Sequence, residues 1–495
     1  MPRLELHRYR EDDEYSQRIS NGVASGIVCG FCIFKGSANE AKQITAELQE
    51  LSFRTNRKHL LFSCDAEWGL PMRLGGTVTE FPHALALARS KYPNAVYEAA
   101  FAIAEEMKEL GIHWNFAPVA DVNSDPDNPI INIRSFGDNV DDVTTSARAY
   151  ARGMHDCGII ATAKHFPGHG QTKVDSHRAL PVLHEPPSHF EDIELPPFEA
   201  LIESKVPSIM TGHLAAPALA CSLGATNDSE LLPASLSPYL TRKLLRDKLK
   251  FESVIITDSM EMAAVKATYP DEELAAEMAL RAGNDIVLMP NSFEKVYEHL
   301  KEKSLNDDLF TKQLIESAER VEQLVLQYLP KQRTSPDLAA HQALAENIAY
   351  AAIDYTGDAK AIKNLKHISV LCDDLVLQGE KKNILIDRLR QISGLKVIDS
   401  DLLTSEISTE CGLFILDRPR GRLLDQSDEQ AVVSPIINFL NIAKESEFAF
   451  PCIFLVGNPY LKIGMLSQVG GCVVRTYSDS APSIKALTKW IGSIR

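Results

Sequence analysis

The stretch TAKHFPGHGQTKVDSHRAL, from Thr162 to Leu180, carries the residue types of a proton-transfer site directly after an apolar run. Within it Asp175 and His177 are two positions apart, so in an extended segment their side chains point to the same side. A carboxylate beside an imidazole fixes the tautomer of the ring and raises its basicity. We therefore predict an Asp–His acid/base pair, with Asp258, in the sequence VIITDSMEM, as the candidate nucleophile.

Other interpretations of these residues stay open. His165 and His169 have the four-residue spacing of a helical zinc pair, but Pro167 and Gly168 between them disfavour a helix, which leaves a zinc site formed by a loop. The glycines and the lysine of GHGQTK suggest a phosphate cradle, without the spacing of a P-loop. The histidines of a structured loop can also simply form hydrogen bonds. For Asp258 the non-catalytic interpretation is the N-cap of the helix that follows.

Short apolar runs alternate with amphipathic helical patterns up to about residue 330, and these elements must position the polar residues. The apolar runs are continuous, as in parallel strands that are buried on both faces. Eight such runs with intervening helices predict a (β/α)8 barrel. The predicted strands are Arg3–Leu6, Ile27–Phe34, Leu60–Cys64, His113–Pro118, Ile159–Lys164, Ser208–Thr211, Ser253–Thr257 and Asp285–Met289.

Polar residues follow five of these predicted strands. Barrel enzymes place their chemistry at the C-terminal ends of the strands, so a set of polar residues there indicates a site rather than ordinary loops. The residues are Asp65, Asp121, Lys164 with His165, His213, and Asp258.

A second domain is predicted after the barrel. We expect a catalytic barrel over residues 1–335, a helical linker over 336–365 and a smaller α/β domain over 366–495. No dinucleotide or P-loop motif occurs in the last part, so its chemistry is not predicted, and it either covers the barrel rim or mediates dimerisation. Its predicted strands are His367–Cys372, Lys396–Asp399, Cys411–Leu416, Cys452–Val456 and Cys472–Arg475.

Charge and composition exclude several classes of partner. The 495 residues carry a formal net charge of -16, which argues against nucleic acid or an anionic membrane surface as a partner. The charged start MPRLELHRYREDDEYSQR does not look like a secretory signal, and no apolar run reaches about 18 residues, so we expect a cytoplasmic protein. The nine cysteines are scattered like reduced core residues. Cys29 and Cys32 form a CxxC, but IVCGFCIF predicts a buried strand rather than a redox or metal site.

Several motifs resemble glycoside hydrolase family 3, and within it the β-N-acetylglucosaminidase (β-hexosaminidase) branch. They are AKHFPGHGQTKVDSHRALP, NFAPVADV, INIRSFGD and IITDSMEMAAV, with DAEWGLPMRL and RAGNDIVLMP also in register. The resemblance implies a retaining, two-step mechanism. Asp258 would attack the anomeric carbon, His177 would protonate the leaving oxygen and then deprotonate water, and Asp175 would orient His177. An imidazole would thus replace one of the two usual carboxyl groups.

The resemblance also implies which residues bind the terminal sugar: Asp65, Arg73, Arg134, Lys164 and His165. Both arginines have an alternative interpretation as surface ion-pair residues. His213 either lines the pocket or is simply a histidine at a strand end. The chain departs from the family pattern at DAEWGL, which brings in Trp68, and at Gln171, where an aspartate is common in the branch.

The expected activity is therefore an exo-acting β-N-acetylglucosaminidase that acts on small carbohydrates such as peptidoglycan turnover fragments. No cofactor and no metal are expected. Four alternatives stay open: a β-glucosidase of the same family, an N-acetylglucosaminide phosphorylase, a catalytically silent sugar-binding barrel, and a metallohydrolase. The sequence predicts no oligomeric state.

Overall fold

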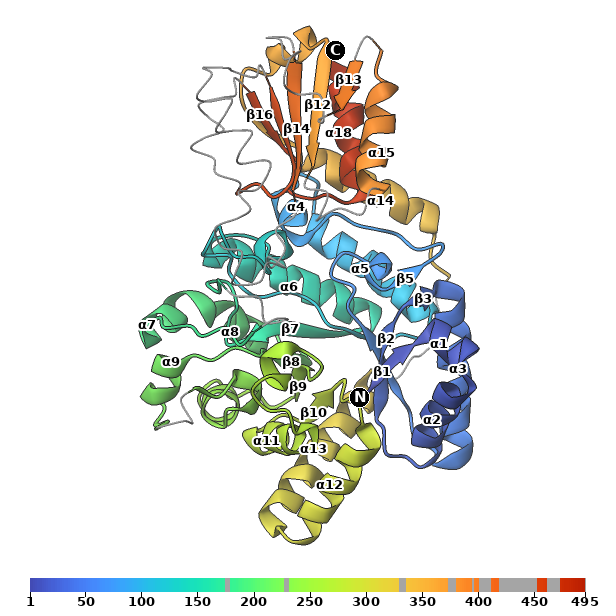
Figure 1. The fold of residues 1–495 in the computed structure, drawn as a ribbon, viewed down its shortest axis with the longest axis vertical. Coiled ribbons are helices and arrows are strands. Elements are labelled where there is room, and N and C mark those ends of the chain that lie inside the picture. Colours follow the sequence, from blue (N-terminus) through green and yellow to red (C-terminus); the bar gives the residue numbers. More distant parts are fainter. Residues whose placement is uncertain are drawn as a thin grey trace. The chain divides into compact units, whose positions relative to one another are not determined.

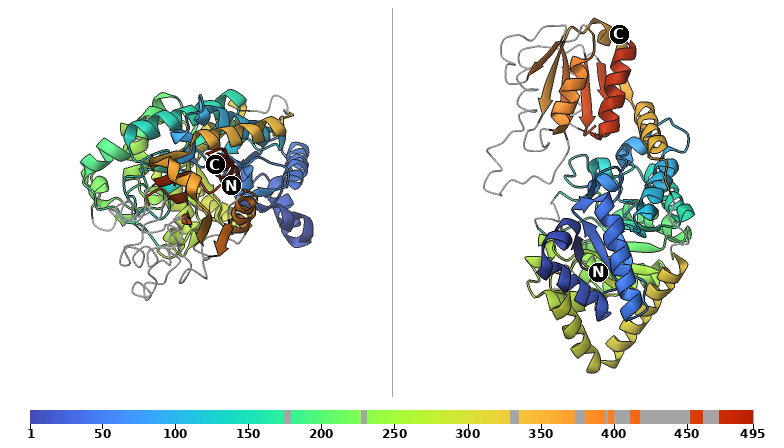
Figure 2. Two further views of the ribbon diagram at one scale, coloured as in Figure 1. Left: turned by 90° about the horizontal axis from the view of Figure 1, so that it is seen from above. Right: turned by 90° about the vertical axis from the view of Figure 1, so that its right-hand side faces the viewer.

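The computed structural model describes residues 1–173, 179–226, 231–328, 335–372, 380–393, 396–399, 411–417, 452–460 and 472–494 (Figures 1 and 2). The contacts between residues divide the chain into two units. The first consists of Met1–Thr79, Val96–Asp125 and Ser135–Leu338, and the second of Glu80–Ala95, Pro126–Arg134 and Ala339–Arg495.

The first unit is built on eight parallel strands in the order β1-β2-β4-β6-β7-β8-β9-β10. The backbone N–H of Met289, just after the last strand, donates to the carbonyl of Met1 at 2.7 Å, so the sheet nearly closes and the predicted barrel is confirmed. The strands are β1 (Arg3–Glu5), β2 (Gly30–Phe34), β4 (Leu61–Cys64), β6 (Trp114–Asn115), β7 (Ile160–Phe166), β8 (Ser208–Thr211), β9 (Val254–Ser259) and β10 (Ile286–Leu288).

The helices of this unit begin and end at recognisable signals. Ser37 and Glu40 form a capping box at the start of α3, and Gly158 ends α6 in the left-handed region with φ of 85°. Figure 1 shows α12 and α13 side by side, beyond the strands. The main helices are α1 (Leu6–Glu11), α2 (Asp13–Ala24), α3 (Ala38–Thr55), α5 (Ala95–Glu109), α6 (Val140–Cys157), α8 (Pro196–Glu203), α9 (Pro217–Ser222), α11 (Glu272–Ala282), α12 (Phe293–Leu305) and α13 (Asp308–Gln327), with the π-helical η6 (Tyr239–Lys248).

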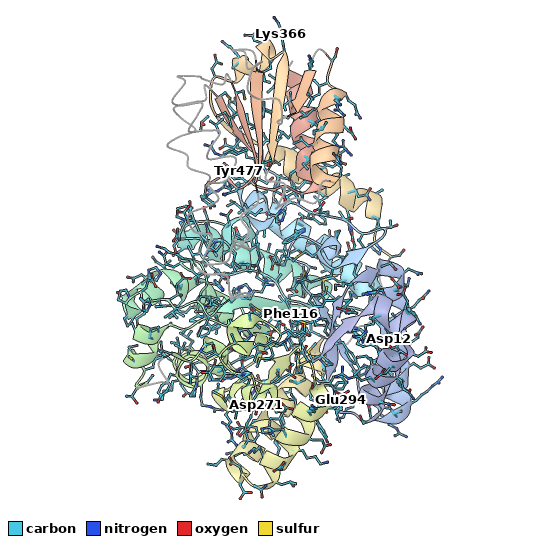
Figure 3. All side chains as sticks on the ribbon, in the orientation of Figure 1. Asp12, Phe116, Asp271, Glu294, Lys366 and Tyr477 are labelled. Carbon is cyan, nitrogen blue, oxygen red and sulfur yellow. The ribbon has the colours of Figure 1, made fainter. Side chains whose placement is uncertain are left out.

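Apolar side chains from the strands fill the barrel. Trp114, Phe116 and Ile256 are buried in one cluster, in which Phe116 is labelled in Figure 3. The polar end of Trp114 is satisfied, because its Nε1–H donates to Thr162 Oγ1 at 2.5 Å. This packing explains why continuous apolar runs marked the strands.

Two sequence predictions about strand ends were wrong. The run expected at His113–Pro118 forms a regular strand only over Trp114–Asn115, although Phe116 N–H still donates to the Cys64 carbonyl and the Pro118 carbonyl still accepts from Lys164 N–H. Asp258 lies inside β9, and the helix after it, α10 (Ala263–Lys266), follows Met262, so Asp258 is not its N-cap.

The second unit contains a six-stranded sheet in the order β11-β16-β15-β14-β12-β13, in which only β11 is antiparallel to its neighbour. The five predicted strands are present. β11 was not predicted; it lies within residues 336–365, where the sequence suggested a helical linker. The elements are α14 (Leu338–Ala351), β11 (Asp354–Gly357), η7 (Ala359–Asn364), β12 (His367–Cys372), α15 (Glu380–Arg390), β13 (Lys396–Asp399), β14 (Cys411–Asp417), β15 (Ile453–Gly457), β16 (Cys472–Arg475) and α18 (Ala481–Ile494).

A segment from the first half of the chain, residues 80–95 with α4 (Ala84–Arg89), packs within this second unit. His83 Nδ1 lies 2.9 Å from Ser478 Oγ, and both residues are buried. Glu80 accepts the backbone N–H of Ala481 at the start of α18, at 2.9 Å. The predicted boundaries near residues 335 and 365 did not include this segment, and they stay predictions. No helix in the described ranges is long and apolar enough to cross a bilayer.

Candidate active site

Asp65 directly follows β4 and lies between two cationic groups. Its Oδ1 accepts from Lys164 Nζ at 2.9 Å and its Oδ2 from Arg73 Nη2 at 2.6 Å. Lys164 Nζ is also 2.8 Å from Glu67 Oε1, and the Arg73 guanidinium lies 4.4 Å from the centre of the Phe34 ring. Three of the residues predicted to bind the sugar therefore meet at the C-terminal end of the barrel.

The ion pairs among Asp65, Lys164 and Arg73 keep these side chains charged. Burial alone would raise the pKa of the Asp65 carboxyl, but the charges of Lys164 and Arg73 outweigh burial and hold that pKa well below its usual range. Burial would lower the pKa of Arg73, and the charge of Asp65 raises it instead. Arg73 is thus not an ordinary surface ion-pair residue, since its partner is the partly buried carboxylate at the end of β4. A fixed carboxylate beside fixed donors suits the recognition of hydroxyl groups.

His165, near the end of β7, is held by a carboxylate. Asp121 Oδ2 is 2.8 Å from His165 Nδ1, while Asp121 Oδ1 accepts the backbone N–H groups of His165 and His169 at 3.0 and 2.9 Å. The Asp121 carboxylate fixes the His165 tautomer with a proton on Nδ1, which leaves Nε2 as the acceptor. The sequence marked Asp121 only as a strand-end residue, and nothing in its spacing indicated that it would bind the histidine loop.

His213 contacts the residue that follows Asp258. It is fully buried, its Nε2 is 2.9 Å from the carbonyl oxygen of Ser259, and its Nδ1 is 2.7 Å from Ser235 Oγ. With a proton on Nε2, the ring donates to the residue that follows Asp258 and accepts from Ser235. Whether His213 also lines the sugar pocket stays a prediction. Asp258 itself is partly exposed, and its Oδ1 accepts the N–H of Ser259 at 2.7 Å.

The glycine-rich turn is anchored by its neighbours. A Cβ on Gly170 would overlap the Val122 carbonyl, and one on Gly168 would press on the Glu194 carboxyl group. Gln171 Oε1 accepts from Ser124 Oγ at 2.7 Å, which gives this departure from the family pattern its own partner. A carbonyl and a carboxyl group thus lie against the two glycines, and both repel an anion, which disfavours the phosphate-cradle interpretation.

Several predicted residues cannot be assigned to the group around Asp65. Asp175 and His177 lie outside the described residues, so their acid/base role stays a prediction. Arg134 ends η2 (Asn132–Arg134), and its guanidinium donates to the Ile130 carbonyl at 3.2 Å; its sugar-binding role also stays a prediction.

The metal and redox interpretations of the sequence find no support in the described parts of the chain. His165 belongs to a strand, so His165 and His169 are not a helical zinc pair. Over the residues that the structure describes, no cluster of three or more metal-ligating side chains occurs. Cys32 is buried in β2, where burial raises the pKa of its thiol to about 12, so it is not a reactive thiolate.

Comparison with known proteins identifies the family. The model of the glycosyl hydrolase family 3 N-terminal domain matches residues 3–324, which is most of the barrel unit. This chain belongs to glycosyl hydrolase family 3. The resemblance read from the sequence motifs is thereby confirmed at the level of the family.

Several relatives of this chain are named beta-hexosaminidases or beta-N-acetylglucosaminidases. Beta-hexosaminidase A of Pseudoalteromonas piscicida is 32% identical over 69% of this chain and 60% of its own length. The beta-hexosaminidase of Psychromonas ingrahamii is 30% identical over 58% of this chain and 82% of its own. A solved family 3 beta-N-acetylglucosaminidase from Paenibacillus sp. str. FPU-7 superposes with a TM-score of 0.78 at 25% identity, covering 96% of this chain and 92% of that protein. The chain thus spans about three fifths of the first relative and most of the other two.

Proposed function

We propose that this family 3 member is a retaining exo-glycosidase that releases terminal β-linked N-acetylglucosamine. The observation that carries the proposal is the ion-paired group of Asp65, Lys164 and Arg73, on the same barrel end as Asp258. Asp65 can accept from sugar hydroxyl groups, and Lys164 and Arg73 can donate to hydroxyl or acetamido oxygens. The names of the beta-hexosaminidase relatives support the choice of an N-acetyl sugar.

The proposed reaction has two steps. Asp258 attacks the anomeric carbon while His177 gives a proton to the leaving oxygen, and a glycosyl ester of Asp258 forms. His177 then takes a proton from water, which attacks the anomeric carbon and releases the sugar with its original configuration. Asp175 orients His177, and an imidazole in general has a pKa of about 6.5, which suits both directions of proton transfer near neutral pH.

The backbone around Asp258 supports its role as a nucleophile. The N–H of Ser259 holds one carboxylate oxygen, and His213 holds the carbonyl of Ser259. The carboxylate therefore has a defined orientation before the sugar arrives, which reduces the reorganisation that attack requires.

The proposed natural substrates are peptidoglycan turnover fragments in the cytoplasm, in which N-acetylglucosamine is linked to anhydro-N-acetylmuramic acid. The support for both is the resemblance of the KHFPGHG…DSH stretch to the N-acetylglucosaminidase branch. A dual specificity is the alternative, since a Cellulomonas fimi relative, 29% identical, is named beta-N-acetylglucosaminidase/beta-glucosidase.

The test is the initial rate on an aryl β-N-acetylglucosaminide against the matching aryl β-glucoside, with EDTA present and phosphate absent. The proposal predicts a strong preference for the N-acetyl sugar. Equal or reversed rates would contradict the substrate assignment. Turnover that requires added phosphate and yields the sugar 1-phosphate would identify a phosphorylase instead, and a loss of activity in EDTA would indicate a metallohydrolase.

A further inference from the structure

Glu194 is a buried acidic residue that the proposed mechanism does not use. It ends the π-helical turn η3 (Phe190–Glu194) and is fully inaccessible to solvent. No described residue forms a well-aligned hydrogen bond with either carboxyl oxygen. His189 Nε2, on the short helix α7 (Pro187–His189), is 3.5 Å from Glu194 Oε1. Burying a carboxyl group with so few well-aligned hydrogen bonds lowers the stability of the folded protein, which suggests that Glu194 has a role other than stabilising the fold.

The Glu194 carboxyl group lies directly against the glycine-rich turn. Gly168 has φ of +130° and packs so closely on Glu194 that an added Cβ would come within 2.6 Å of the glutamate Cβ. The N–H of Gly170 faces the carboxyl group and favours its charged form. The Val122 carbonyl also lies against Gly170, where an added Cβ would overlap it. The turn is therefore held between the backbone after β6 and the end of η3.

The same turn leads into the segment that contains residues 175 and 177. Before that segment, the N–H of His169 is held by Asp121, and His169 Nδ1 is 2.5 Å from Thr172 Oγ1. After it, Leu183 N donates to the Ala215 carbonyl at 2.8 Å. Two buried carboxyl groups, of Asp121 and Glu194, thus contact the described turn that precedes this segment in the chain.

We propose that Glu194 is a positioning residue for the acid/base step: its carboxylate holds the Gly168–Gly170 turn, which precedes Asp175 and His177 in the chain. This inference rests on the acid/base role proposed above for those two residues. Glu194 touches neither the sugar nor a reacting atom, and it acts only through the turn.

The charge of Glu194 changes near neutral pH, which gives the role a pH dependence. Burial raises the pKa of its carboxyl group to about 7, His189 and the Gly170 N–H oppose this rise, and the nearby charge of Asp121 adds to it. The proximity of Glu194 in turn raises the pKa of His189. Asp121 also holds His165. The carboxylate that attracts the Gly170 N–H is thus lost as pH falls through about 7.

The test uses two leaving groups, because an activated dinitrophenyl group departs without a proton whereas a phenyl group needs one. The full chain is compared with Glu194→Gln, which keeps an acceptor oxygen without the charge, and Glu194→Leu, which has neither. Glu199→Gln, an exposed carboxylate five residues away on α8, is the matched control. His177→Ala is measured in parallel as the reference for lost acid catalysis.

We expect Glu194→Leu to lose about 10-fold in kcat/KM on the phenyl glycoside and less than about 2-fold on the dinitrophenyl glycoside. Glu194→Gln should lose less and should lack the component of the pH–rate profile near pH 7, a readout that stands even if the leucine variant fails to fold. Equal losses on both substrates, or an unchanged pH profile in Glu194→Gln, would overturn the inference. If His177→Ala shows no dependence on the leaving group, the acid/base assignment itself fails. If His177→Ala shows this dependence on the leaving group and the Glu194 variants do not, only the positioning role of Glu194 is contradicted.

Discussion

Replacing Glu194 by glutamine removes a buried titratable group and keeps the shape of the side chain. In the folded protein the pKa of this carboxyl group rises from 4.5 to about 7, chiefly because burial penalises the charge. At 1.36 kcal/mol per unit, this rise corresponds to about 3 kcal/mol. The folded-state pKa is the higher one, so the folded protein holds the Glu194 proton more tightly than the unfolded chain. The contribution of this proton to the free energy of unfolding is fully present below pH 4.5 and is lost as pH rises through about 7. The wild type should therefore lose stability over this window through Glu194, whereas the glutamine variant should not.

The assay is the melting temperature of both proteins at pH 4.5 and pH 8. Near pH 4.5 the two should melt at similar temperatures, because a neutral carboxyl group and an amide are alike in size and polarity. At pH 8 the variant should melt higher, and the difference should grow by about 5–10 °C between the two pH values for a unit of this size. The variant would thus be more stable and yet less active at pH 8. A difference in melting temperature that does not change with pH would refute the raised pKa of the buried Glu194 carboxyl group.

Three further substitutions probe the barrel end. Lys164→Met leaves Asp65 with Arg73 as its cationic partner. We expect a loss of about 3 kcal/mol in the free energy of unfolding and a higher KM, measured by thermal unfolding and steady-state kinetics. Unchanged values of both would contradict the ion-pair role. Gly170→Ala introduces a Cβ against the Val122 carbonyl and should lower the free energy of unfolding by about 1–3 kcal/mol. A melting temperature equal to that of the wild type would show that the backbone of the turn can move to accommodate the Cβ. Asp121→Asn removes the charged acceptor of three bonds and should raise KM more than it lowers kcat, whereas an effect on kcat alone would indicate that His165 does not bind the sugar.

The barrel was predictable because each of its strands is buried on both faces and therefore reads as a continuous apolar run. The strand ends were less predictable, since the apolar run of β6 continues to Pro118 whereas the regular strand ends at Asn115. β11 (Asp354–Gly357) escaped prediction for the opposite reason: its residues are exposed, so no apolar run marks it.

The site was predictable where it depends on strand ends. Parallel strands bring their carboxyl ends together, so Asp65 and Lys164 could be expected near each other although 99 residues separate them. Glu194 could not be found this way, because it lies in an ordinary amphipathic pattern and its importance arises only from packing against the glycine turn. The packing of His83 on Ser478, 395 residues apart, is likewise a tertiary contact that no local pattern encodes.

The most direct test of the central claim is the mass of the protein quenched during turnover of dinitrophenyl β-N-acetylglucosaminide. His177→Ala is the variant to use, because the activated leaving group still departs while attack by water is slow, so the intermediate accumulates. The account predicts one N-acetylglucosaminyl group on the peptide that contains Asp258, and its absence in Asp258→Asn. Turnover without any adduct, or an adduct on another residue, would contradict the assignment of Asp258 as the nucleophile.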